Sequence, residues 1–195
     1  MPRVLIGLIL LLQGCVPAQF SGYMPLGSGR LEGDHCTTIK DILSFAVDGK
    51  VELRVWIPKD RAPADLRVLI FVPMDSTVRL LSTDVVLESS EWLQPRRLHV
   101  EALAQAGQSS DLPPTAELAG KRHVNYTAWG SIDSITEGSR FWMKFGKEPP
   151  HIAPTSRARS FSVRFPELSI NDEKHQVTPL LFEAYTRVGI AGFCN

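Results

Sequence analysis

The chain has 195 residues, of which 44% are hydrophobic, and this length and composition predict one folded domain with a core of its own. Its 21 Lys and Arg residues balance its 21 Asp and Glu residues, so the formal net charge is zero. A polyanion binds through a surplus of basic charge, and the composition therefore argues against nucleic acid as a partner.

The chain begins with a short apolar segment. Arg3 supplies a positive charge, and residues 4–12 (VLIGLILLL) are apolar or glycine. As a helix this run would span about 14 Å, less than half of the roughly 30 Å that a bilayer core requires. A basic residue before an apolar run of this length is typical of a secretory signal peptide and does not predict a membrane-spanning helix.

The apolar segment ends in the sequence LQGC, residues 12–15, which resembles the lipobox of bacterial lipoproteins. The resemblance covers only the first 15 residues. It implies that residues 1–14 are a signal peptide, that the thiol of Cys15 receives a diacylglycerol, and that the new amino terminus is acylated. Several acyl chains together would give stable membrane anchoring. The alternative is an ordinary signal peptide, cleaved after Gly14 or Ala18.

The remaining cysteines are Cys36 and Cys194. With Cys15 assigned to lipid, these two form an even pair, and an oxidising periplasm would join them in a disulfide. Such a bridge would close a loop of about 160 residues and stabilise the fold by about 5 kcal/mol at most. Two unpaired, buried thiols are the alternative.

Residues 16–35 contain several glycines and prolines and no regular apolar period, which predicts a flexible tether between the lipidated cysteine and a domain over residues 36–195. As a flexible coil this tether would span about 25 Å. Val16 is not the aspartate that marks retention at the inner membrane in well-studied lipoproteins. The resemblance therefore implies an anchor in the outer membrane, with the domain facing the periplasm.

From residue 40 onward, apolar and polar residues alternate, which predicts half-buried strands. In residues 50–58 (KVELRVWIP), the residues of the apolar face are Val51, Leu53, Val55 and Ile57. Asp48 and Gly49 precede this segment and predict a tight hairpin turn. Residues 66–73 (LRVLIFVP) are almost continuously apolar, which predicts a central strand covered on both faces.

The alternation continues to the end of the chain. Further residues predicted to face inward are Leu98, Val100, Ala102, Val124, Tyr126, Ala128, Phe141, Met143, Phe145, Phe161, Val163 and Phe165. Two Pro-rich stretches, residues 105–122 and 146–160, are predicted to be loops. About eight or nine short strands predict an all-β fold, a single β-sandwich of the immunoglobulin-like kind. A small barrel is the alternative.

Common enzyme and metal motifs are missing from the sequence, and we predict no catalytic residues, no metal site and no cofactor. Residues 172–175 (DEKH) contain two carboxylates and an imidazole, but a hairpin must turn there, and a solvated polar turn is the favoured interpretation. His123 with Ser131, Asp133 and Ser134 has the composition of a hydrolytic set, but such combinations arise by chance among many serines.

A candidate binding surface comes from aromatic residues. Trp56, Trp129 and Trp142 fall opposite the predicted inward-facing residues, and a row of exposed aromatic side chains would bind a sugar, a peptide or a protein. Packing of these tryptophans in the core is the favoured interpretation, since a sandwich has two faces per sheet and a bulge would invert the assignment.

Basic pairs occur at Arg96 and Arg97, at Lys121 and Arg122, and at Arg157 and Arg159, and they would form a patch for anionic lipid or phosphate if loops brought them together. Scattered solvated charge is the favoured interpretation.

Three functions are compatible with these features. The favoured one is a lipid-anchored, non-catalytic β-sandwich that binds another component of the cell envelope, a protein or a glycan. The second is a carrier of small apolar or lipid ligands, which requires a cavity or an open mouth in the sandwich. The third is an envelope hydrolase, which requires a deep pocket with converging titratable groups.

Overall fold

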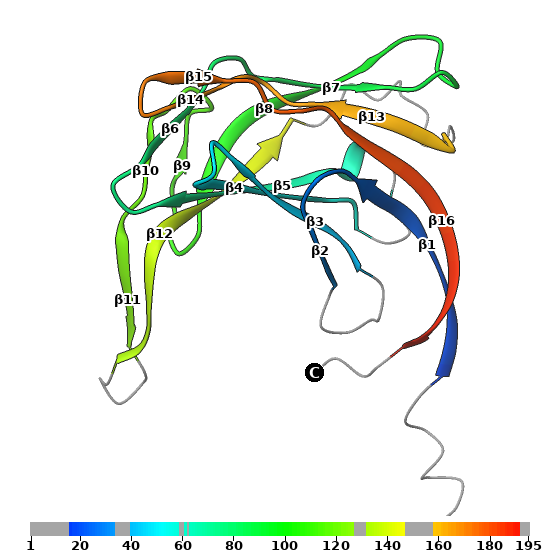
Figure 1. Ribbon diagram of the computed structural model, residues 1–195, viewed down its shortest axis with the longest axis horizontal. Coiled ribbons are helices and arrows are strands. Elements are labelled where there is room, and N and C mark those ends of the chain that lie inside the picture. The colour runs from blue at the N-terminus through cyan, green and yellow to red at the C-terminus, as the bar shows by residue number, and fades with distance from the viewer. Residues whose placement is uncertain are drawn as a thin grey trace, which may run out of the picture.

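The computed structural model describes residues 16–33, 40–58, 61, 63–126, 132–146 and 158–191. Most of them lie in β-strands, so the predicted all-β fold is confirmed (Figure 1). The strands are β1 (Val16–Leu26), β2 (Arg30–Gly33), β3 (Lys40–Val47), β4 (Val51–Trp56), β5 (Arg67–Pro73), β6 (Thr77–Leu80), β7 (Asp84–Glu88), β8 (Arg96–Gln105), β9 (Asp111–Leu112), β10 (Leu118–Ala119), β11 (Arg122–Tyr126), β12 (Ile132–Phe145), β13 (Ser160–Arg164), β14 (Leu168–Ile170), β15 (Glu173–His175) and β16 (Leu180–Ala191). Within these described ranges, helical structure is limited to the 3-10 turn η1 (Pro63–Asp65).

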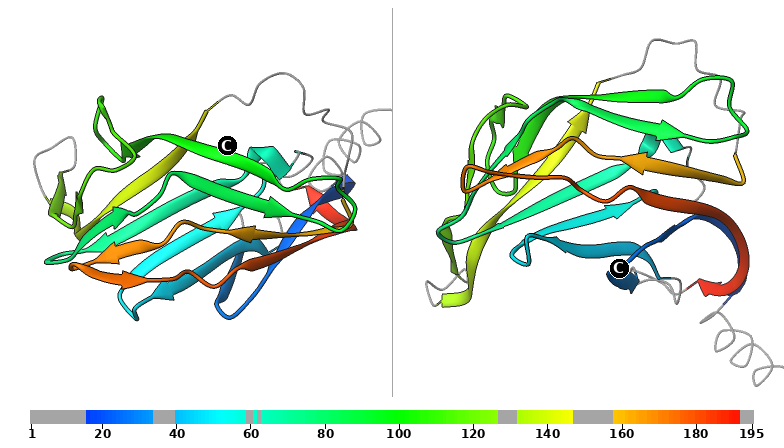
Figure 2. Two further views of the ribbon diagram at one scale, coloured as in Figure 1. Left: turned by 90° about the horizontal axis from the view of Figure 1, so that it is seen from above. Right: turned by 45° about the horizontal axis from the view of Figure 1, so that its top comes forward.

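A large antiparallel sheet contains most of these strands, in the order β1-β16-β13-β7-β8-β12-β5-β4-β3-β2, with β9 and β11 added to β8 and β12. The sheet curls, so that its first half faces its second half (Figures 1 and 2). Cα atoms of β1 come within 8 Å of Cα atoms in β3 and β4. The apolar side chains of both halves form one buried cluster between them.

A second, smaller sheet has the strand order β10-β6-β14-β15. Its β14–β15 hairpin turns at Asn171 and Asp172, which both have positive φ angles. Asn171 bonds to Thr77 twice: its side-chain oxygen accepts from the Thr77 amide at 2.9 Å, and its own amide donates to the Thr77 carbonyl at 3.0 Å. Gly120, directly after β10, lies very close to the end of β5. A Cβ atom at this position would be only 1.7 Å from the carbonyl oxygen of Pro73, so the approach requires glycine.

The β3–β4 hairpin and strand β5 follow the sequence prediction. Asp48 and Gly49 have φ angles of 55° and 66°, both left-handed, and the Lys50 amide donates to the Val47 carbonyl at 3.4 Å, which closes the tight turn. The four residues of the predicted apolar face, Val51, Leu53, Val55 and Ile57, are all buried. Strand β5 is covered on both faces, since Val68, Leu69, Ile70 and Val72 are buried.

The prediction for β8 is wrong at one residue because of a β-bulge. Lys144 of β12 pairs with Ala102, but the next residue, Phe145, pairs with Val100, so β8 has an extra residue at this point. An extra residue reverses the alternation of faces. Val100 is therefore buried as predicted, whereas Ala102 is only half-buried and Leu103 takes the buried position.

The predicted tether over residues 16–35 does not describe residues 16–33, which form strands β1 and β2. Strand β1 pairs with β16 along its whole length, from Val16 with Ala191 to Leu26 with Leu181. Local composition gives no signal for this strand, because its partner lies at the other end of the chain. Together with the short strands β9, β10 and β14, these pairings explain why the described residues form more strands than the eight or nine expected.

An aromatic cluster around Phe161 of β13 lies in the core. Its ring stacks on Phe182 of β16 with centroids 5.2 Å apart, and Tyr23 of β1 meets it edge-on at 5.0 Å. Trp92, from the connection between β7 and β8, stacks on it at 5.6 Å. Phe161 thus joins the first strand, the last strand and a connection from the middle of the chain.

We expect Phe161→Ala to lower the free energy of unfolding by about 3–5 kcal/mol, because it leaves a cavity at the centre of this cluster. Urea unfolding monitored by circular dichroism measures the change. The matched control is Leu93→Ala, since the side chain of Leu93 is fully exposed, and it should change stability by less than about 0.5 kcal/mol. Equal effects of the two substitutions would contradict the central role of Phe161.

Candidate functional site

An apolar patch lies on the outer face of the β4–β5–β12 part of the large sheet. Residues paired directly opposite each other on neighbouring strands share a face. Leu69 of β5 pairs with Trp142 of β12, and Phe71 of β5 pairs with Arg140 of β12 and Glu52 of β4. We call this surface the aromatic face, and its apolar residues are Trp56, Leu69, Phe71 and Trp142.

Trp56 and Trp142 touch each other across strand β5. Their ring centroids lie 5.4 Å apart with an interplanar angle of 73°, so that the edge of one indole meets the face of the other. Both side chains are half-buried, and Leu69, which lies on the strand between them, is only 7% exposed. The pair therefore covers Leu69 and still presents indole surface to the outside, on the face that the alternation in β4 and β12 predicts.

Charged residues border the aromatic face on the side of β2 and β3. Glu52 accepts hydrogen bonds from the hydroxyl of Ser44 at 2.5 Å and from Nε of Arg54 at 2.7 Å. Arg54 also approaches Glu32 at 3.5 Å, and Glu32 pairs in turn with Arg30. These contacts link β2, β3 and β4 on the outer surface of the sheet.

The same contacts set the ionisation of Glu52. Partial burial raises the pKa of a carboxyl, but the hydrogen bonds from Ser44 and Arg54 and the positive charges of Arg54 and Arg30 outweigh it, so the pKa of Glu52 lies below its usual value. The hydrogen bond to Glu52 raises the pKa of Arg54, against the opposing effect of burial. The border of the aromatic face is therefore charged at neutral pH.

The structure does not bring Arg96 and Arg97 to the aromatic face. Both lie at the start of β8, whereas Trp142 pairs with Ala104 near its end, seven residues or about 23 Å from Arg97. The Arg96 guanidinium lies 4.1 Å from the ring centroid of Trp92.

Arg97 and its neighbours form a separate charged group. The guanidinium of Arg97 lies 3.6 Å from a carboxylate oxygen of Asp84, and Nδ1 of His99 lies 3.0 Å from the other. Arg96 and Arg97 thus contact different partners, so the structure does not join them into one basic patch.

Several predicted residues lie outside the described part of the chain. These residues are Cys15, Cys36, Trp129 and Cys194. Three expectations therefore remain predictions. They are the lipidation of Cys15, the disulfide between Cys36 and Cys194, and the position of Trp129.

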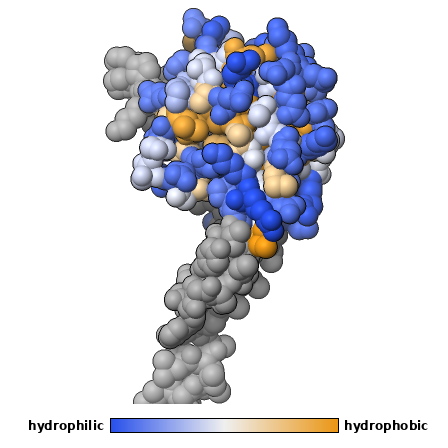
Figure 3. Space-filling view, turned by 90° about the vertical axis from the view of Figure 1, so that its left-hand side faces the viewer, coloured by the Kyte–Doolittle hydropathy of each residue, from blue (hydrophilic) through white to orange (hydrophobic). Residues whose placement is uncertain are grey.

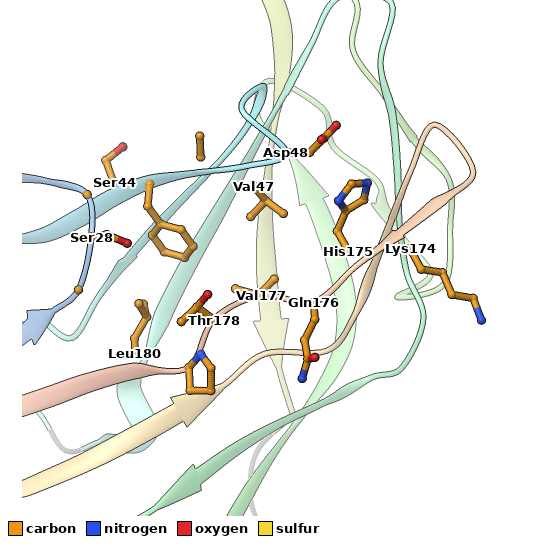
Figure 4. Close-up of a pocket in the computed structure, with 15 residues that line it drawn as sticks. Ser28, Ser44, Val47, Asp48, Lys174, His175, Gln176, Val177, Thr178 and Leu180 are labelled. Atoms are coloured by element: carbon orange, nitrogen blue, oxygen red, sulfur yellow. The ribbon is translucent and has the colours of Figure 1, made fainter.

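A second candidate site is a cleft of about 510 Å³ at the edge of the large sheet, which we call the edge cleft. It lies between the β1–β2 turn, strand β3 and residues 174–180. Val47, Val177 and Leu180 are buried residues of its lining, whereas Lys174 points away from it (Figure 4). Its volume is in the range of small-molecule sites. Nε2 of His175 is buried there without a hydrogen-bond partner among the described residues.

Of the candidate hydrolytic set, only the side chain of His123 is described, and Ser131 lies outside the described residues. Nε2 of His123 lies 3.2 Å from the hydroxyl of Ser139, which also accepts a hydrogen bond from the Lys121 amide at 3.1 Å. The side chains of Asp133 and Ser134 are not described. Across the described residues, no group of three or more His, Cys, Asp or Glu side chains is placed to hold a metal ion.

A limited hydrophobic area lies on one side of the molecular surface (Figure 3). On the side that lies at the left in Figure 1, hydrophilic residues surround a limited hydrophobic area (Figure 3). Exposed apolar surface of this kind is ordinary for a folded protein. Within the described ranges, no helix is long and apolar enough to cross a bilayer.

Sequence reasoning missed two features of these sites. The contact of Glu52 with Ser44 and Arg54 could have been found, because the alternation that places Trp56 on the outer face also places Glu52 and Arg54 there. The edge cleft could not, because it forms where residues 27–29 and 174–180, far apart in the sequence, meet.

Comparisons with protein-family models, with curated proteins and with solved structures found no match to this chain. Function is therefore inferred from the residues and geometry of the chain itself.

We expect Glu52→Gln to weaken the acid sensitivity of the fold. Because the pKa of Glu52 is lower in the folded state, its ionised form stabilises the fold above the unfolded pKa, and this contribution is lost as the pH falls through the folded pKa. Between about pH 6 and pH 3 the variant should therefore lose less stability than the wild type, as measured by urea unfolding. Glu173→Gln, which removes an exposed carboxylate of β15, is the control, and parallel curves for Glu52→Gln and wild type would contradict the prediction.

Proposed function

We propose that this chain is a bacterial lipoprotein, anchored through Cys15 in the outer membrane, whose all-β domain faces the periplasm and binds another envelope component without catalysing a reaction. The anchor is supported by the apolar run of residues 4–12 and the LQGC sequence that ends it. The partner is a protein or a glycan, since aromatic side chains bordered by charge suit either.

The proposed architecture is a β-sandwich of the immunoglobulin-like kind. The facing halves of the curled sheet and the single buried cluster between them support it. A disulfide between Cys36 and Cys194 is part of the proposal, because an oxidising periplasm favours the pairing of two cysteines.

The observation that carries the binding proposal is the aromatic face. Trp56 and Trp142 pack against each other in a surface that charged residues border, with Arg140 exposed beside Phe71. Tryptophan and arginine are enriched among the residues that dominate binding energy, and an apolar centre with a polar rim is the usual organisation of an interface.

We expect Trp142→Ala to reduce recovery of the partner to roughly a tenth or less, because removing a central tryptophan of an interface typically costs 2 kcal/mol or more. The measurement is mild crosslinking of the intact lipoprotein in its own envelope, followed by purification and mass spectrometry. Unchanged recovery would contradict the proposal.

Two further variants make this test decisive. Arg140→Glu changes an exposed charge at the border of the aromatic face and leaves the core intact, so it should also reduce recovery. Leu93→Ala lies far from this face in the β7–β8 connection and should recover the partner as the wild type does. Melting temperatures of all three variants show whether a loss of recovery reflects a loss of folding.

The edge cleft favours a second function, the carriage of a small apolar ligand. Its lining includes the aliphatic side chains of Val47, Val177 and Leu180, together with polar residues such as Ser44 and Gln176. Extraction of the purified protein with organic solvent and mass spectrometry would reveal a bound ligand. A substitution that fills the cleft, Val177→Phe, should abolish that ligand and leave partner recovery unchanged.

We expect Cys15→Ala to leave the precursor unlipidated and uncut at this site, because alanine has no thiol for the diacylglycerol. Mass spectrometry of the intact protein and fractionation of membranes measure the result. A mature mass and membrane location equal to those of the wild type would refute the anchor.

A further inference from the structure

Strand β1 begins at Val16, the residue directly after Cys15. A strand rises about 3.3 Å per residue, so no flexible spacer separates the proposed lipid from the folded structure. The residues paired with the start of β1 are the last ones of β16, from Arg187 with Phe20 to Ala191 with Val16. We call residues 16–20 and 187–191 together the ribbon end.

The ribbon end projects from the body of the molecule (Figure 1). Pairing between β16 and β13 stops at Glu183, and among the described residues the continuation of β16 pairs only with β1. A two-stranded ribbon is marginally stable at best in water, and it gains from contact with another surface. The side chain of Val188, in the ribbon end, is 78% exposed.

The composition of the ribbon end is unusual for a surface element. In the sequence, residues 16–20 (VPAQF) and 187–191 (RVGIA) contain no acidic residue and one basic residue, Arg187. An apolar segment with basic flanking charge suits the interface between lipid headgroups and acyl chains, where arginine reaches toward phosphate.

Two more arginines lie beside the same ribbon. Arg61 and Arg159 line a groove of about 180 Å³ with Gly22 and Tyr185, two residue pairs from Arg187. The side chains of Arg61, Arg159 and Arg187 are all exposed.

Two carboxylates lie close to Arg159, because Glu183 pairs with the next residue, Ser160, and Glu91 contacts the backbone of Arg159. Glu183 lies further along β16, and Glu91 accepts a hydrogen bond from the amide of Arg159. The three arginines outnumber these two carboxylates by one, and the remaining positive charge attracts anionic phospholipid headgroups within about a Debye length of 8 Å.

We propose that the ribbon end is a docking surface for the phospholipid headgroups of the membrane that holds the anchor, with Arg187, Arg61 and Arg159 directed at anionic phosphates. This inference rests on the proposed lipidation of Cys15. The domain then contacts the membrane through strands β1 and β16, and no flexible linker separates it from the lipid.

The test places a photo-crosslinking amino acid at position 188 of the full-length lipoprotein, reconstituted in vesicles of phosphatidylethanolamine and phosphatidylglycerol. We expect phospholipid adducts, roughly tenfold more than with the same crosslinker at position 93, whose native side chain is fully exposed in the β7–β8 connection. In this background Arg187→Glu should reduce the adducts, and the matched control Arg97→Glu, at the start of β8, should not.

The outcomes separate this inference from the proposed function. A protein that carries acyl chains on Cys15 and floats with the vesicles, but gives no lipid adduct at position 188, overturns the docking surface and leaves the anchor intact. Adducts to a second protein or to another copy of this chain at that position overturn it as well. A protein without acyl chains that stays out of the membrane refutes the anchor itself, and the docking surface with it.

Discussion

The packing of Phe161 against Phe182, Tyr23 and Trp92 is the contact on which the rest of the fold depends. Tyr23 lies near the start of the described chain and Phe182 near its end, so this cluster brings the two ends together in one core. Stacked and edge-on aromatic pairs add to the free energy gained by burying their large apolar surfaces. Strands β1, β16, β13 and β7 are neighbours in the sheet, so the cluster forms when these strands pair and ties both ends of the described chain to its middle.

The curled sheet explains why the two candidate sites lie where they do. In β4 the buried residues Val51, Leu53 and Val55 face the core, and the intervening residues must then face outward. Trp56 lies on that outer face because of the same alternation. The edge cleft has a different origin, because it lies where the sheet has not closed between β3 and the segment leading into β16.

Local patterns predicted the parts of the fold that depend on neighbouring residues. The Asp48–Gly49 turn and the alternation in β4 are encoded within a few residues, and both predictions are confirmed. Strand β1 was missed because its pairing with β16 joins the two ends of the chain, and composition near Val16 contains no trace of it. The bulge at Ala102 was missed because it is defined by the register with β12 and not by β8 alone. The Trp56–Trp142 contact was predictable only in part. Alternation within each strand gives the face on which each tryptophan lies, but not that β4 and β12 flank the same strand β5.

The position of the ribbon also relates the aromatic face to the proposed lipid. Strand β4 ends at Trp56, and the chain then reaches Arg61, which lines the groove beside Gly22 and Tyr185. Five residues span at most about 18 Å, so the Trp56 end of the aromatic face lies close to the base of the ribbon. Gly22, beside Arg61, lies seven residues after Cys15, which is about 23 Å of extended strand, so these two spans limit how far the aromatic face lies from the proposed lipid.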